Sequence, residues 1–494
     1  IEEFLKKHAA SRLAGEAGER LLRLRLSESP GDRRRIVEAV RLFAAGVPEN
    51  RRAAVLVRLT DQLLASGRPD KYDLAREALD TAAKSAGADP NAVADFQLQA
   101  RRGLIALRLD DLTTARRNLL SAAFGLPRDR LVNLWLGELY ERTGKLHRAW
   151  SRYIQSALDR DPPREAFAAL DRLNRNPEFR KTFTMQDAEQ LLEGRIIEFH
   201  PPGRYDPAEA GAAEPVRLVE LFTCINAPGT AAPELAFGAL REFFESEPVA
   251  FVAYHLSSPD ADPLTSDAAM TRAAHYKVTT APAAYFDGRT PDDSEGDERS
   301  AARVMATYRR LSMPGGERDR SWRLTGRAAL NGDELTGSVV LTRSAGAVGR
   351  AASRPASAAA ETRPASAPAT RPTEPDLRLH VVLCERTVMV PGANKLVLHR
   401  CVARALLSPA GGHAISSTDR RRTFPIRVRA DEIMKAIEKQ LAALEEEQGM
   451  PFAARPTYVD LGACSVVVIL QDAGSGQVLT AGTFDVKPEA QRPS

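Results

Sequence analysis

Cysteine is scarce in this sequence, which has only four cysteines in 494 residues. They stand at positions 224, 384, 401 and 464, so no pair has the CxxC spacing of a redox or zinc site. The sequence therefore predicts neither a metal site nor a cofactor. Two alternatives stay open for Cys384 and Cys401: a disulfide across adjacent strands, or two buried free thiols.

Long apolar runs and an excess of one charge are also missing. No apolar stretch is long enough to span a bilayer, so no transmembrane segment is expected. The 69 basic residues are offset by 65 acidic ones, which argues against a nucleic-acid partner. A basic run, Arg420–Arg422 with Arg427 and Arg429, is interpreted as the solvated face of a strand. A chain that begins at Ile1 is compatible with processing or truncation that removed a signal peptide or lipid anchor.

What is present is enough sequence for several domains. A chain of 494 residues is too long for one hydrophobic core, and we expect three domains. Residues 1–190 have apolar positions at helical spacing and few strand signals, which predicts helices. Residues 215–315 alternate strand and helix signals, whereas residues 320–488 contain mostly strand signals.

The helical part contains an internal repeat of 34 residues. Gly103 recurs as Gly137, and Ala115 recurs as Ala149. The small glycine lets two helices approach closely, and the alanine together with a large residue four positions later fills the seam. This period is typical of tetratricopeptide repeats, so we expect a tetratricopeptide-like array. Such an array either holds a peptide or partner protein on its concave surface or serves only as a spacer.

The most informative stretch is Val216–Pro233, which reads VRLVELFTCINAPGTAAP. A short apolar strand, Leu218–Phe222, runs into a turn rich in proline and glycine, and a helix opens near Glu234. Catalytic dithiols lie at such strand-to-helix turns because the helix N-terminus stabilises a thiolate. This turn has no dithiol.

This region resembles thioredoxin-like proteins of the bacterial cell envelope, secreted or lipid-anchored, whose first strand reads ELFTxxxCxxC. The matching segments follow the family in order: Glu220–Thr223, Glu234–Phe237, Val249–His255, Asp262–Thr265, Ser266–Tyr276 and Val278–Pro282. The two cysteine positions of the family fall on Ala227 and Thr230, and Pro282 stands where these folds carry a cis-proline. The resemblance implies a thioredoxin-like fold, a degenerate active site and a location in the cell envelope or periplasm.

The missing dithiol implies that thiol-disulfide exchange has been lost, because exchange needs an accessible thiolate and a second thiol. One alternative is an oxidoreductase that uses Cys224 alone or with a cysteine from a partner. The resemblance also implies peptide binding, in which the backbone at Ala281 and Pro282 pairs with an extended substrate. Pro282 could instead only shape a turn. His255 and His275 are interpreted as structural histidines.

The C-terminal part predicts a mainly-β domain. A hairpin is expected over 321–341, strands at 377–385, 395–407 and 424–428, a helix at 431–447 and a last hairpin over 464–486. This pattern favours an immunoglobulin-like β-sandwich. Residues 344–375, which are rich in Ala, Pro, Ser, Arg and Thr, are expected to form a disordered insertion.

The predicted fold class is thus multidomain: an all-α tetratricopeptide-like array, an α/β thioredoxin-like domain and a mainly-β immunoglobulin-like sandwich. The predicted function is a non-catalytic protein- or peptide-binding scaffold of the bacterial cell envelope. Two alternatives remain, a Cys224-dependent thiol-disulfide oxidoreductase and a structural component of a larger assembly.

Overall fold

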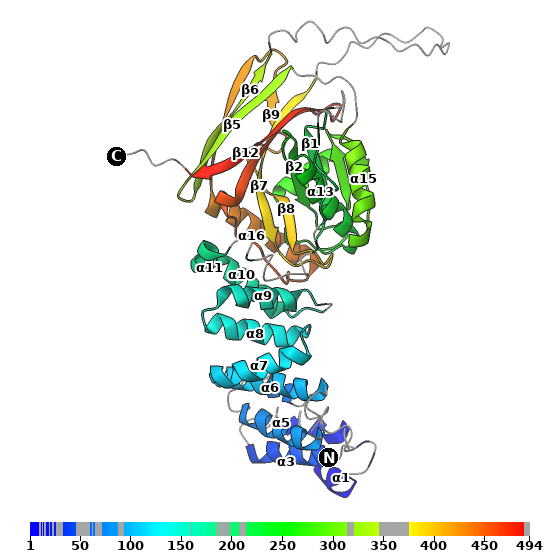
Figure 1. Cartoon of the computed structure of the whole chain (residues 1–494), viewed down its shortest axis with the longest axis vertical. Helices are drawn as coiled ribbons and strands as arrows, with labels where there is room; N and C mark the ends of the chain where they lie inside the picture. The colour runs from blue at the N-terminus through cyan, green and yellow to red at the C-terminus, as the bar shows by residue number, and fades with distance from the viewer. Residues whose placement is uncertain are drawn as a thin grey trace, which may run out of the picture. The chain divides into compact units, whose positions relative to one another are not determined.

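The computed structural model divides the chain into two compact units, Ile1–Leu192 and Glu193–Ser494, which are described separately (Figure 1). The structure describes residues 1–8, 33–45, 72–86, 93–159, 161–183, 199–206, 214–313, 321–344 and 375–488, with isolated residues at 11, 13, 16–18, 20, 21, 24, 25, 60, 61, 63, 64, 187 and 197. The predicted insertion at 344–375 lies outside these ranges except for its two end residues. The predicted boundary at residue 190 also lies outside them.

The first unit consists of helices in its described residues. They are α1 (Glu2–Lys7), α3 (Arg33–Ala45), α5 (Tyr72–Ala86), α6 (Val93–Arg108), α7 (Leu112–Gly125), α8 (Arg130–Arg142), α9 (Leu146–Ala157), α10 (Arg164–Arg175) and α11 (Pro177–Thr182). Helix α6 packs against α7, and α8 packs against α9.

The two repeated glycines lie where these helices meet. A Cβ atom on Gly103 would stand 2.6 Å from the Leu119 side chain, and one on Gly137 would stand 2.5 Å from the Tyr153 ring. Both distances are too short for a carbon contact, so the close approach of each helix pair requires glycine. The internal repeat therefore corresponds to a repeated packing contact.

The second unit is organised around one sheet of twelve described strands. They are β1 (Leu218–Thr223), β2 (Ala250–His255), β3 (Ala283–Phe286), β4 (Arg289–Asp292), β5 (Trp322–Asn331), β6 (Glu334–Arg343), β7 (Leu377–Met389), β8 (Leu398–Leu406), β9 (His413–Ile415), β10 (Arg421–Arg429), β11 (Cys464–Asp472) and β12 (Val478–Pro488). Their order is β10-β6-β5-β12-β11-β7-β8-β2-β1-β3-β4, and β9 pairs with β7.

Helices α13 (Ala231–Phe243), α14 (Asp267–Tyr276) and α15 (Ala301–Leu311) alternate with β1 to β4 along the chain. β1 and β2 are parallel, with Val219 opposite Phe251, and β3 is antiparallel to β1. This is the element order that the sequence predicts for its middle part. A fourth long helix, α16 (Ala430–Gln448), buries the apolar stripe formed by Ile433, Ile437, Leu441 and Leu444.

The predicted fold class is wrong, because the middle and C-terminal parts share one sheet. β8 pairs with β2 at Val402 and Ala253, β7 pairs with β8, and β11 pairs with β7. β7 and β11 are buried along most of their length, whereas a strand of a two-sheet sandwich exposes alternate side chains. The described chain is therefore a mixed α/β structure without a separate immunoglobulin-like sandwich. An apolar pattern predicts a strand but does not determine its neighbour.

A buried ion pair connects α14 to both parts of the sheet. Arg272 and Glu220 have no exposed side-chain surface, and Arg272 Nη2 lies 2.7 Å from Glu220 Oε1. Arg272 Nη1 also donates to Gln471 Oε1 of β11 at 3.0 Å. Glu220, the first residue of the ELFT motif, therefore helps to fix β1 relative to β11.

Candidate functional site

The turn between β1 and α13 is the candidate site, because the sequence predicts a lost dithiol there. The short 3-10 helix η2 (Pro228–Thr230) lies in this turn. Ala227 is 5% exposed, and Thr230 is fully buried. The Thr230 hydroxyl lies 2.7 Å from the carbonyl oxygens of Cys224 and of Ala227, which accept its hydrogen bond. Thr230, onto which the sequence resemblance places the second cysteine of the family, thus closes the turn.

Cys224 lies inside the turn and is fully buried. Its Sγ donates to the carbonyl oxygen of Asp260 at 3.2 Å. Burial, reinforced by the negative charge of Asp262, raises the pKa of the Cys224 thiol to about 12. Such a thiol carries almost no thiolate at neutral pH, so this environment opposes nucleophilic attack.

The other three cysteines, Cys384, Cys401 and Cys464, are also buried free thiols. Cys384 of β7 lies opposite Ala403 of β8 rather than opposite Cys401. Cys384 and Cys401 are therefore two buried free thiols and do not form a disulfide with each other.

A segment from the C-terminal part covers the turn. The loop 390–397 joins β7 to β8, and its Asn394 N–H donates to the carbonyl oxygen of Ile225 at 2.9 Å. Asn394 Nδ2 donates to Glu234 Oε1 at 3.1 Å and to Thr230 Oγ1 at 3.3 Å. A Cβ on Gly392 would stand 2.4 Å from the Ile225 oxygen, so the loop approaches the turn as closely as glycine allows. The protein's own residues therefore occupy the space over the turn.

A buried carboxylate-imidazole pair lies beneath this loop. His399 Nδ1 lies 2.6 Å from Glu234 Oε2, and His399 Nε2 lies 2.9 Å from the carbonyl oxygen of Val390. Because both ring nitrogens face acceptors, the ring is held as a cation. Burial opposes this charge, but the Glu234 carboxylate outweighs it and raises the pKa of His399. Burial likewise opposes the Glu234 charge, and His399 outweighs it and lowers the pKa of Glu234.

His255 joins this region through a second carboxylate. His255 Nδ1 lies 2.9 Å from Asp262 Oδ2, which also accepts from the Ile225 N–H at 2.8 Å. The His255 and His399 rings meet edge to face with centroids 5.4 Å apart. His275 lies elsewhere, against Tyr276 with centroids 4.8 Å apart. Among the described residues, no group of three or more His, Cys, Asp or Glu is placed to hold a metal ion.

Ala281 and Pro282 lie beside the turn, and the peptide bond between them is cis. Ala281 is 8% exposed and belongs to a small apolar cluster with Cys224 and Ala227. Its N–H donates to the carbonyl oxygen of Ser258 at 3.1 Å. The amide that a peptide substrate would need at this position is therefore engaged within the chain.

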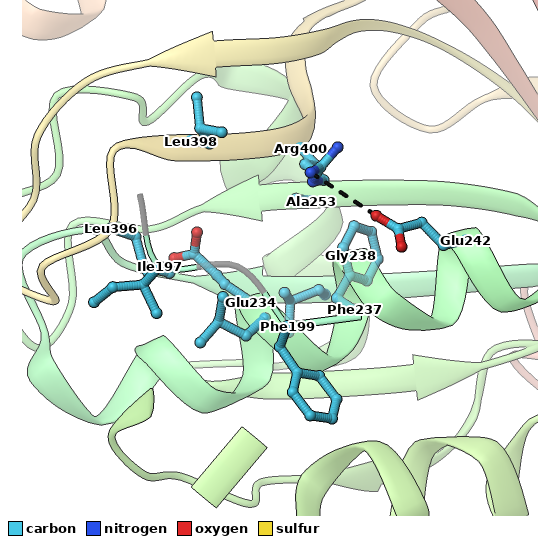
Figure 2. A pocket seen from close by; sticks show the side chains of 12 residues that line it. Ile197, Phe199, Glu234, Phe237, Gly238, Glu242, Ala253, Leu396, Leu398 and Arg400 are labelled. Carbon is cyan, nitrogen blue, oxygen red and sulfur yellow. Dashed lines mark ion pairs between the residues drawn. The ribbon is translucent and has the colours of Figure 1, made fainter. Parts of the chain in front are cut away.

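The cavity next to the Glu234–His399 pair is small. It measures about 30 Å³ and is bounded by Ile197, Phe199 and Leu396, with Glu234 on its α13 side (Figure 2). An ion pair between Arg400 and Glu242, 4.0 Å apart, lies at its edge (Figure 2). A cavity of this size holds a water molecule or two rather than a peptide side chain.

Sequence reasoning missed the role of three residues that define this site: Glu234, Asn394 and His399. The sequence indicates Glu234 only as a member of the matching segment Glu234–Phe237, and His399 only as a neighbour of His380 across two strands. Asn394 and His399 come from a segment about 160 positions away, which no local pattern connects to the turn. One signal was present, because a histidine within the apolar strand 398–406 needs a hydrogen-bonding partner when it is buried.

Comparisons with known proteins leave the chain without an assigned family. No protein-family model and no curated protein matches it. Among solved structures, HBP35 of Porphyromonas gingivalis is similar at 11% identity and a TM-score of 0.36, over 57% of this chain and 80% of that one. A domain of the outer membrane lipoprotein Omp28 from the same organism is similar at 12% identity and a TM-score of 0.19, over 36% of this chain and 96% of that one. Both likenesses are too slight to carry an argument about fold or function. Within the described part of the chain, no helix combines the length and the hydropathy needed to cross a bilayer.

Proposed function

We propose that this chain is a non-catalytic protein- or peptide-binding scaffold of the bacterial cell envelope. The observation that carries the proposal is the closed turn between β1 and α13. Ala227 and Thr230 stand where the resemblance places the dithiol, and the loop that contains Asn394 covers the turn through hydrogen bonds to Ile225, Thr230 and Glu234. A loss of sulfur alone would leave an open site, whereas this turn is also filled. The location in the envelope rests on the sequence resemblance.

The rival function, an oxidoreductase that uses Cys224, meets two obstacles in the same turn. The thiol has no exposed surface, and its pKa is raised to about 12. At pH 7 the thiolate fraction would be on the order of one in 100,000, far below that of catalytic cysteines. A partner's cysteine would also have to displace the covering loop before it reached the sulfur.

The first unit offers a more suitable place for binding, a cavity of about 610 Å³ between α5, α6 and α7. We call it the α5–α7 cavity. Ligand sites of proteins commonly measure 300–1,000 Å³ and combine an apolar lining with a few polar groups. Here Ile105 and Leu109 supply apolar surface, while Arg102, Arg117 and Asn118 supply polar groups. The size and lining of this cavity support a binding function for the helical unit.

A selection experiment tests the binding half of the proposal. Linear peptides are selected from a random library on the full chain, and their affinities are measured by fluorescence anisotropy. The variant Leu109→Glu/Arg117→Glu changes two exposed residues that line the α5–α7 cavity and should lose at least tenfold in affinity. The matched control Arg116→Glu/Leu120→Glu changes two exposed residues that do not line it and should bind as the wild type does. Failure to select any peptide, or equal binding by both variants, would overturn this half.

Insulin reduction tests the catalytic half. The full chain with dithiothreitol should reduce insulin no faster than dithiothreitol alone, and Cys224→Ser should not change that rate. Activity that disappears in Cys224→Ser would replace the scaffold with the oxidoreductase.

A further inference from the structure

The outward face of strands β5, β6 and β10 carries mainly one kind of charge. Strand register fixes its members, because alternate residues of each strand point to opposite sides of a sheet. Trp322, Val339 and Phe424 face the core. The outward positions, which we call the β5–β6–β10 face, are Arg323, Thr325, Arg327, Ala329, Asn331, Glu334, Thr336, Ser338, Val340, Thr342, Arg421, Thr423, Pro425, Arg427 and Arg429. They include five arginines and one carboxylate.

The arginines differ between the two ends of this face. Near the β5–β6 turn, Arg427 lies 2.7 Å from Glu334, and Arg429 pairs with Asp333 and Asp431. At the other end, Arg323, Arg327 and Arg421 are exposed, and none of them forms an ion pair with a described carboxylate; Asp485 of β12, which precedes the Val486–Ala328 pair, lies 3.6 Å from Arg386 instead. Figure 1 shows β5 and β6 at the margin of the second unit. The positive charge is therefore neutralised at one end of the face and left open at the other.

The three open arginines form a triangle set by the sheet. Arg421 and Arg323 lie in one cross-strand row with Thr342 between them, so their Cα atoms are about 10 Å apart. Arg327 lies four residues along β5 from Arg323, at about 13 Å. Hydroxyls of Thr325, Thr342 and Thr423 lie between these positions. Guanidinium and hydroxyl donors in such an array are suited to several phosphate groups at once.

We propose that the β5–β6–β10 face binds the anionic headgroups of a lipid bilayer. An open sheet face can meet many headgroups together. The outward positions hold no aromatic side chain, which disfavours single-stranded nucleic acid, since its bases stack on aromatic rings. They also lack the large apolar centre that is usual in protein interfaces. This function is separate from the binding proposed for the α5–α7 cavity.

Vesicle sedimentation tests the proposal with the full chain. The chain should bind vesicles of mixed phosphatidylglycerol and phosphatidylcholine, not vesicles of phosphatidylcholine alone, and added salt should weaken the binding. Each arginine near an anionic surface contributes about fivefold in affinity, so the variant Arg323→Gln/Arg327→Gln/Arg421→Gln should lose on the order of 100-fold. The variant keeps the polar outward pattern of the strands, and circular dichroism verifies that it folds.

The matched control is Arg289→Gln/Arg299→Gln/Arg310→Gln, which removes three exposed arginines outside this face and gives the same change in net charge. It should keep at least a third of the wild-type affinity. Equal losses in the two variants would mean attraction by net charge alone and would overturn the proposal. So would the absence of binding to anionic vesicles, or binding to polyglutamate in preference to them.

Discussion

The turn between β1 and α13 is filled by the protein's own residues, whereas the α5–α7 cavity is open. In the turn, Thr230, Asn394 and His399 direct their hydrogen bonds at other residues of the chain, and the adjoining cavity has room for little more than water. In the α5–α7 cavity, polar groups border about 610 Å³ of space. The hydrogen bonds in the filled turn stabilise the fold but leave no room for a ligand. The open cavity leaves room for a ligand.

This difference separates the turn from the cavity that we propose as a binding surface. The strand-turn-helix arrangement of β1 and α13 is where the sequence resemblance would locate chemistry. The contacts made there instead hold a distant loop in place. Substitutions in the turn should therefore act mainly on stability, and substitutions in the cavity should act mainly on binding.

The largest effect is expected from removing the partner of a buried charge in the turn. His399→Phe leaves the Glu234 carboxylate buried without its cation, and such losses cost about 3–5 kcal/mol. Native-state hydrogen exchange in urea, resolved by peptide, gives the free energy of unfolding of each unit separately. The loss should be confined to the second unit. A loss below about 1 kcal/mol would show that the pair contributes little and that the turn is held by other contacts.

A second buried carboxylate in the same unit, Glu385, has weaker contacts with its cationic partner. Glu385 Oε2 lies 3.4 Å from Arg404 Nε, and neither atom has a hydrogen-bond partner in the structure described. Burial raises the pKa of Glu385 to about 7, and the Arg404 charge offsets this only in part. The folded state therefore binds the proton more tightly than the unfolded state, whose carboxyl titrates near 4.5.

The pH dependence of stability should reveal this group. The stabilisation from a protonated Glu385 is complete below pH 4.5 and is lost as pH rises through 7, a change of about 3 kcal/mol. Glu385→Gln cannot titrate, so its stability relative to the wild type should improve by about that amount between pH 4.5 and pH 8. Urea denaturation of both proteins across this range measures the difference. Parallel curves for the two proteins would contradict the prediction.

Cysteines placed at positions 227 and 230 test whether the turn is closed. In Ala227→Cys/Thr230→Cys, both new thiols should stay covered by the loop 390–397. Their alkylation by iodoacetamide should be roughly 100-fold slower in buffer than in urea, because reaction requires local opening. Insulin reduction should stay at the background rate. Rapid alkylation with a gain of activity would show that the turn is open and lacks only the two thiols.

The sequence predicted the elements around this turn well and their partners poorly. Leu218–Thr223 and Asp267–Tyr276 follow from apolar patterning and from the Ser266 cap, which accepts from the Ala269 N–H. The same patterning cannot show that β8 lies beside β2, because a one-residue bridge at Val402 carries that pairing. The immunoglobulin-like sandwich was wrong for this reason. The contact between Asn394 and Thr230 was likewise invisible, since it depends on how two distant segments meet.

A smaller effect is expected where the loop approaches the turn. Gly392→Ala adds a Cβ that would stand 2.4 Å from the Ile225 oxygen, so the loop must shift, and overpacking of this kind costs about 1–3 kcal/mol. The shift should also speed alkylation of Cys224. The control Gly411→Ala adds a Cβ with no heavy atom within 4 Å and should change neither quantity. Equal behaviour of the two variants would remove the loop from the account of the closed turn.

The smallest effect on stability is expected in the α5–α7 cavity, when the cationic partner of a carboxylate is removed there as it is in His399→Phe. Arg102 lies 3.2 Å from Asp80, with side chains 33% and 53% exposed. Solvent screens such a pair, so Arg102→Met should lower the free energy of unfolding of the first unit by less than about 1 kcal/mol. It should also weaken the binding of the peptides that were selected on the full chain. Hydrogen exchange and anisotropy on one preparation give both quantities. A loss above 2 kcal/mol without any loss of binding would make this pair structural, and the cavity would then resemble the turn.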